Sequence, residues 1–160
     1  MFPVLLRARG SMQWFAWRSV DDPDGAIVRE IDRLFVASSL PALIERWRAR
    51  DPDAPVDESV LSIDLDALIA ELRRGARPDD DTLLNALNVL DDIACACRAI
   101  GRDAAFGGIE TRLSLYKIVF SRTQAGRIAK VSRRPMSEAD RGAIADWLEA
   151  GADMVCAAMT

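Results

Sequence analysis

The sequence contains no histidine, and this absence excludes more chemistry than any other feature of the composition. Without histidine there is no Ser-His-Asp or Cys-His nucleophile system, no histidine metal ligand and no histidine general base. The groups left for catalysis are carboxylates, Tyr116 and only two lysines, Lys117 and Lys130. A glycine-rich phosphate loop is also missing, because Gly107 and Gly108 form a lone pair without the Walker spacing. These absences leave few groups for catalysis and no motif for a cofactor, so no cofactor is expected.

Cysteine is scarce as well: Cys95, Cys97 and Cys156 cannot all pair within one chain. A structural Zn²⁺ site needs a full set of ligands at set spacings, so no metal is expected and the cysteines are interpreted as small helix residues. No apolar run approaches the roughly 18 residues of a membrane span, and the opening residues do not resemble a signal peptide. The sequence therefore predicts a cytoplasmic protein that does not enter a membrane.

The length of 160 residues, half of them hydrophobic and 29% charged, is typical of one globular domain. Met12 is a candidate alternative start of the protein, so residues 1–11 are interpreted as a disordered extension or as a remnant added to the natural sequence. Residues 12–160 are then expected to form a single domain.

Charge is unevenly distributed along the chain, although the net charge is only −4. Residues 51–92 carry twelve acidic side chains against three arginines, a balance of −9, whereas residues 111–134 carry seven basic side chains and no acid. Three interpretations stay open: the two regions face each other or are solvated, the acidic half attracts a basic protein, or the basic half binds nucleic acid. The basic half lacks the interleaved aromatic residues of a base-stacking surface.

Hydrophobic spacing predicts about six helices. They are expected within residues 27–35, 39–47, 64–74, 83–100, 109–120 and 137–155, with short strands at "QWFAW" and "VLSI". Ser39, Asp64 and Ser137 are expected N-caps, and Asp140 completes a capping box. "LSLYKIVF" is also compatible with a strand, and "SRTQAGRIAKVSRRP" is expected to be a basic loop. The predicted fold class is mainly α, a single compact domain of about six helices with short extended segments near the N-terminus.

The stretch "LLNALNVLDDIACACRAIG" has helical spacing but carries four polar groups, Asn85, Asn88, Asp91 and Asp92. All but Asp91 form one stripe on the predicted helix. The stripe is interpreted as a solvent-facing side with Asp92 as an ordinary surface acid, as a buried tie to loop backbone, or as a partner contact. Asp91 borders the apolar face, which favours pairing with an arginine such as Arg112 or Arg141.

Two carboxylate pairs, Asp64/Asp66 and Asp91/Asp92, are the candidates for acid–base chemistry. Asp64 is placed to cap a helix and Asp66 to face its positive end, so helix capping explains the first pair. No catalytic residue is predicted.

Five segments occur in an order that resembles immunity proteins of bacterial contact-dependent growth inhibition systems. They are "IVREIDRLFVASSL", "SIDLDALIAELRRG", "LLNALNVLDDIACACRAIG", "RLSLYKIVF" and "LEAGADMV", and the closest feature is "NALNVLDDIA" followed by Gly101. The resemblance implies a cytoplasmic, non-catalytic protein that binds and neutralises a toxin domain delivered by a neighbouring cell. Many such toxins are nucleases with basic surfaces, so the acidic half would imitate nucleic acid and speed association.

The interface expected from this resemblance combines acids of the acidic half with aromatic anchors. Its residues are Asp79, Asp80, Asp81, Asp91, Asp92, Trp14 and Trp17. Core packing is the alternative role of the two tryptophans. The partner implied is a protein, the cognate toxin domain, with no direct nucleic acid contact and no membrane. The alternative function is a nucleic-acid-binding regulatory protein that uses residues 111–134.

Overall fold

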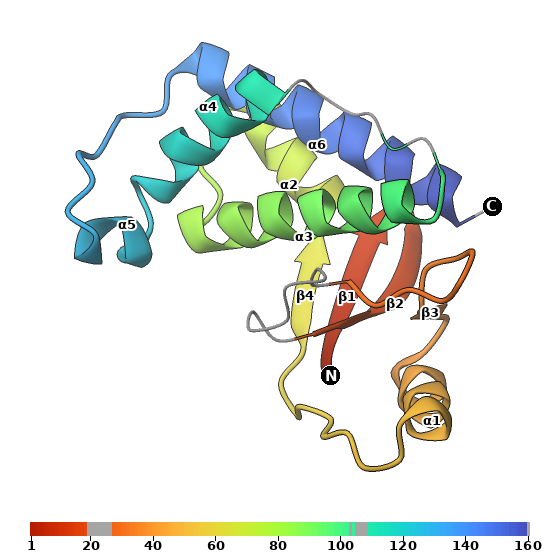
Figure 1. Cartoon of the computed structure of the whole chain (residues 1–160). Helices are drawn as coiled ribbons and strands as arrows, with labels where there is room; N and C mark the ends of the chain where they lie inside the picture. The colour runs from red at the N-terminus through yellow and green to blue at the C-terminus, as the bar shows by residue number, and fades with distance from the viewer. Residues whose placement is uncertain (19–26, 103, 105–108, 160) are drawn as a thin grey trace.

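The computed structural model describes residues 1–18, 27–102, 104 and 109–159, in which a layer of helices lies against a small sheet (Figure 1). The elements are β1 (Phe2–Ala8), β2 (Ser11–Trp17), β3 (Val36–Ala37), α1 (Leu40–Arg50), β4 (Leu61–Asp64), α2 (Leu65–Arg73), α3 (Asp80–Ala99), α4 (Ile109–Phe120), α5 (Gln124–Ile128) and α6 (Glu138–Ala158). The predicted fold class is confirmed: a mainly helical, mixed α/β domain. No helix in the described part of the chain is long and apolar enough to cross a membrane.

β1 is an inner strand of the sheet, pairing antiparallel with β2 and parallel with β4 in the strand order β3-β2-β1-β4. The β1–β2 hairpin turns at Arg9 and Gly10, whose φ angles of 51° and 75° are both positive, as in a two-residue type I′ turn. The interpretation of residues 1–11 as a disordered extension is therefore corrected. Val4 and Leu6 point into the core, and this burial fixes the strand together with pairing on both of its edges.

The two faces of the sheet are covered by different helices. α2, α3 and α6 lie over one face, where Phe15 joins the main core (Figure 1). The next residue, Ala16, points to the opposite face, where α1 packs against β2 and β3. Phe35, Leu43 and Trp47 complete this second, smaller cluster. β2 therefore separates two apolar clusters, as the alternation of side chains along a strand requires.

The helix predicted within residues 27–35 is wrong. Ile27 forms an isolated antiparallel bridge with Trp17, and the Val28 N–H donates to the Ala16 carbonyl at 2.8 Å. The segment then turns back on itself and leaves Ile31 99% exposed. Apart from Ile31, its apolar residues come in two separate pairs, which suit an extended hairpin beside β2 as well as they suit a helix.

The predicted N-caps are confirmed, because their role depends on neighbours only three residues away. The Ser39 and Asp64 side chains accept hydrogen bonds from the N–H groups of Ala42 and Ala67. Ser137 and Asp140 form the expected capping box. α4 is a helix, not the alternative strand. The predicted basic loop after α4 instead contains the short helix α5.

Gly126 of α5 lies against the end of α4, where an added Cβ would stand 2.0 Å from the Phe120 carbonyl oxygen. Because this neighbour is backbone, Gly126→Ala should displace α5 and lower the free energy of unfolding by about 1–3 kcal/mol. Gly142 of α6 is the matched control, because an added Cβ meets nothing within 4 Å. Gly142→Ala should raise the free energy of unfolding by about 0.5–1 kcal/mol. Urea denaturation measures both changes, and a shift of the same sign in the two variants would contradict the contact.

Candidate functional site

Three of the predicted interface acids lie at the N-terminus of α3 and have different roles. Asp79 is the N-cap, and its carboxylate accepts hydrogen bonds from the Thr82 N–H and hydroxyl, each at 2.8 Å. These bonds hold the pKa of Asp79 below its usual value. Asp80 forms an ion pair with Arg122 at 2.8 Å, whereas Asp81 is exposed. Only Asp79 and Asp81 therefore present their charges mainly to solvent.

Arg122 is buried, with its side chain only 1% exposed. Its Nε donates to Asp80, and its Nη1 donates to the Arg134 carbonyl at 3.3 Å. Burial raises the pKa of Asp80, and the positive charges of Arg77 and Arg133 oppose that rise. The acidic and basic segments of the sequence meet at this point, so the field around the α3 N-terminus is mixed in sign.

The prediction that Asp91 pairs with an arginine is confirmed, and the partner is Arg112 of α4. Asp92 is not the ordinary surface acid that was expected: it is partly buried, burial raises its pKa to about 6, and the charge of Asp91 adds to the rise. Asn85 and Asn88 are partly buried too, and neither side chain forms a hydrogen bond within the described residues. Within the described residues, the polar stripe of α3 therefore forms no hydrogen bond to the backbone of a loop.

The two predicted aromatic anchors point to opposite faces of β2. Trp14 packs against the small cluster beneath α1, which fits the core-packing alternative. Trp17 meets Phe2 edge to face with 6.1 Å between the ring centroids, and its Nε1–H is buried without a hydrogen-bond partner among the described residues. Trp17 also lines a cleft of about 580 Å³, here called the linker cleft. Its lining residues are Met1, Phe2, Trp17, Arg18, Pro55, Val56 and Asp57.

One wall of the linker cleft belongs to residues 51–58, the acidic linker, which connects α1 to β4 (Figure 1). Its four acids are all exposed, and in the described part of the chain no arginine or lysine forms an ion pair with them: Asp51, Asp53, Asp57 and Glu58. The Ser59 hydroxyl and N–H hold the pKa of Asp57 below its usual value. The Asp57 N–H donates to the Met1 carbonyl at 2.8 Å, which pins the linker to the start of β1.

Sequence reasoning counted these acids in the charge balance but did not single out residues 51–58 as a site. The contact of the linker with Met1 and Trp17 joins residues far apart in the chain. No local pattern could have indicated it. Of the predicted interface residues, Trp17 is the one that lies in the linker cleft.

Asp64 and Asp66, the first carboxylate pair considered for catalysis, have structural roles. Asp64 caps α2 and lies 3.4 Å from the Arg7 guanidinium. Asp66 accepts hydrogen bonds from the N–H groups of Arg9 and Gly10, at 2.9 and 2.7 Å, and ties the hairpin turn to α2. In the described ranges, no group of three acidic or cysteine side chains is arranged to hold a metal ion. The remaining candidate site is the charged and apolar surface formed by the acidic linker and the linker cleft.

The partly buried Asp92 destabilises the folded protein when it is ionised. Its folded-state pKa of about 6 lies above the usual value of 3.8, so this cost is full above pH 6 and is lost as the pH falls toward 4. Asp92→Asn should raise the free energy of unfolding by about 1–2 kcal/mol at pH 8, with no gain near pH 4. Asp91→Asn, which breaks the pair with Arg112, should lower it at pH 8. Denaturation curves across this pH range test both, and a gain for Asp92→Asn that does not change with pH would contradict the assignment.

No protein-family model, curated protein or solved structure matches this chain. The acidic linker and the linker cleft are therefore the candidate site on the strength of their geometry and charge.

Proposed function

We propose that this chain is an immunity protein of a bacterial contact-dependent growth inhibition system. It binds a cognate toxin domain in the cytoplasm and neutralises it without catalysis. The observation that carries the proposal is the acidic linker, four exposed acids beside an apolar cleft. The resemblance of the sequence to that class supplies the identity of the partner.

The charges available to a partner are those that the fold itself does not use. Asp80 and Asp91 are paired with arginines, and Asp66 is bound to backbone N–H groups. Asp51, Asp53 and Glu58 of the linker have no such partner among the described residues, whereas the Asp57 carboxylate accepts hydrogen bonds from the Ser59 N–H and hydroxyl. Because unpaired charges dominate the field outside a protein, the proposed interface moves from α3 to the linker.

The linker cleft suits a basic side chain of the toxin. Phe2, Trp17 and Val56 provide an apolar wall for the aliphatic stem of a lysine or arginine. Asp57 stands at the cleft and stays ionised, because its pKa is held low. A nuclease binds phosphates through such basic side chains. When this site holds those side chains, they no longer bind the phosphates of the substrate.

The alternative function, nucleic-acid binding by residues 111–134, has less support. Arg112 and Arg122 of that segment are engaged by Asp91 and Asp80. The segment therefore offers fewer free cations than its sequence indicates.

The toxin domain to be tested is the one expected at the end of a large secreted adhesin encoded beside this gene. Neutralising three linker acids should slow association by roughly tenfold at low salt, because electrostatic steering is lost. The variant combines Asp51→Asn, Asp53→Asn and Glu58→Gln. A matched control neutralises three exposed acids elsewhere: Glu45→Gln, Glu110→Gln and Glu138→Gln. Stopped-flow association kinetics measures the rates, and the control should change them by about twofold or less.

Protection in cells tests the function separately from the site. Co-expression of the unaltered chain should restore growth of cells that produce the toxin domain. Failure to restore growth or to bind the toxin would overturn the function. Binding by the linker variant at the unaltered rate would overturn the site and leave the function standing.

A further inference from the structure

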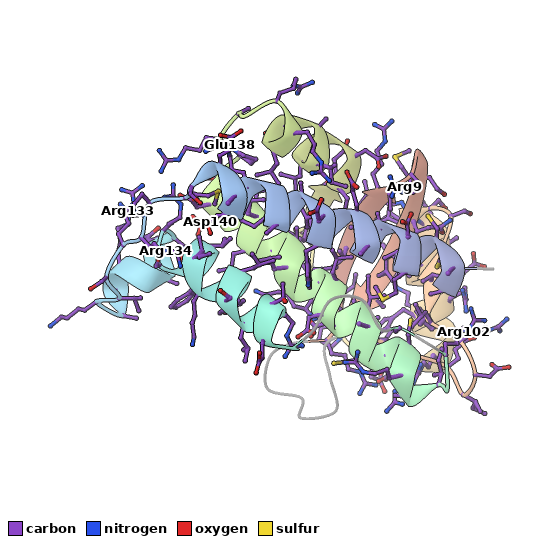
Figure 2. The ribbon with its side chains drawn as sticks, turned by 90° about the horizontal axis from the view of Figure 1, so that it is seen from above. Arg9, Arg102, Arg133, Arg134, Glu138 and Asp140 are labelled. Atoms are coloured by element: carbon purple, nitrogen blue, oxygen red, sulfur yellow. The ribbon has the colours of Figure 1, made fainter. Side chains whose placement is uncertain are left out.

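A second surface, distinct from the acidic linker, is formed by residues 124–133, here called the α5 knob. It comprises α5 and the chain that follows it, and it lies at one end of the molecule, outside the layer formed by α2, α3 and α6 (Figure 1). Figure 2 shows Arg133 and Arg134 at the same end. The proposed function does not use this surface.

Buried polar residues between α4 and α5 fix the α5 knob to the rest of the fold. Ser121, Arg122 and Thr123 are 3%, 4% and 1% exposed. Arg134, where the chain returns, donates its N–H to the Ser121 hydroxyl at 3.4 Å and receives a hydrogen bond from Arg122 on its carbonyl. Thr123 caps α5 through the Gly126 N–H at 3.1 Å. The knob is therefore fixed at both ends, which reduces the entropy lost when a partner binds it.

The end of α5 places a lysine in a conformation that normally belongs to glycine. Lys130 has a φ of 56°, its N–H donates to the Arg127 carbonyl, and the Val131 N–H donates to the Gly126 carbonyl at 3.0 Å. These two bonds define a Schellman motif, in which this position is usually glycine. A non-glycine residue at such a position is uncommon, and here it places the Lys130 side chain at the end of α5.

The α5 knob exposes apolar and basic side chains together. Ile128 is 75% exposed and Val131 is 43% exposed. Arg127 and Lys130 are exposed, and neither side chain has a hydrogen-bond or ion-pair partner within the described residues. The sequence from 111 to 137 contains no acid that could neutralise them. Rigid support beneath an exposed apolar and basic surface is the arrangement of a binding site.

We infer that the α5 knob binds an acidic polypeptide, with Ile128 and Val131 at the centre of the contact and Arg127 and Lys130 at its rim. Protein interfaces have this anatomy, an apolar core inside a polar rim. Nucleic acid fits less well, because residues 124–135 contain no aromatic side chain on which a base could stack. The two surfaces of the chain then take partners of opposite charge.

A short peptide of alternating glutamate and leucine is the probe, titrated to millimolar concentration into the isotope-labelled full chain. The amide NMR signals of the α5 knob should shift. Ile128→Ser and, separately, Arg127→Glu with Lys130→Glu should each weaken binding by roughly tenfold. Two matched controls place the same kinds of change at exposed residues outside the knob, Ile31→Ser and, separately, Arg48→Glu with Arg77→Glu, and both should bind as the unaltered chain does. Amide spectra of each variant without peptide confirm that the knob remains folded.

Three results would overturn the inference. The first is the absence of shifts in the α5 knob at millimolar peptide. The second is a single-stranded RNA that binds the knob more tightly than the peptide does and has the same affinity for the Ile128→Ser variant. The third is an unaltered peptide affinity in both knob variants, which would reduce the contact to general charge attraction.

Discussion

Arg122 stands where three parts of the chain meet: the end of α4, the N-terminus of α3 and the return of the chain at Arg134. Its guanidinium is almost completely buried, and Nη2 has no hydrogen-bond partner among the described residues, so the charge depends on the acceptors of Nε and Nη1 and above all on a counter-charge. Asp80 is that counter-charge. The ion pair attaches the basic segment of the sequence to the acidic one, and it also sets the position from which the α5 knob projects.

Pairing inside the fold decides which charges face outward. Arg122–Asp80 and Arg112–Asp91 join α4 to α3 and remove charges of both signs from the surface. Four of the exposed acids that remain lie on the acidic linker, and three of the exposed basic residues lie on the α5 knob, at a different part of the molecule (Figure 1). The fold pairs part of its acidic half with its basic half, and the charges that stay exposed on the linker and on the knob are available for partners.

Sequence reasoning succeeded where a structure depends on near neighbours. The caps at Ser39, Asp64 and Ser137 act over three residues, and the helical spacing placed Asp91 correctly at the border that Arg112 reaches. It failed where distant segments decide the outcome. The segment after residue 27 is extended because β2 offers it backbone partners, residues 2–8 are an inner strand because β4 pairs with them, and the linker cleft exists because Asp57 reaches Met1.

The coupling between Arg122 and Asp80 is the most direct test of this account. It is measured by a double-mutant cycle with Arg122→Met and Asp80→Asn, using the free energy of unfolding of the four proteins. The account predicts a coupling free energy of at least about 1 kcal/mol, with loss of the NMR signals of the α5 knob in Arg122→Met. Additive effects of the two substitutions, with an unchanged α5 knob, would contradict it.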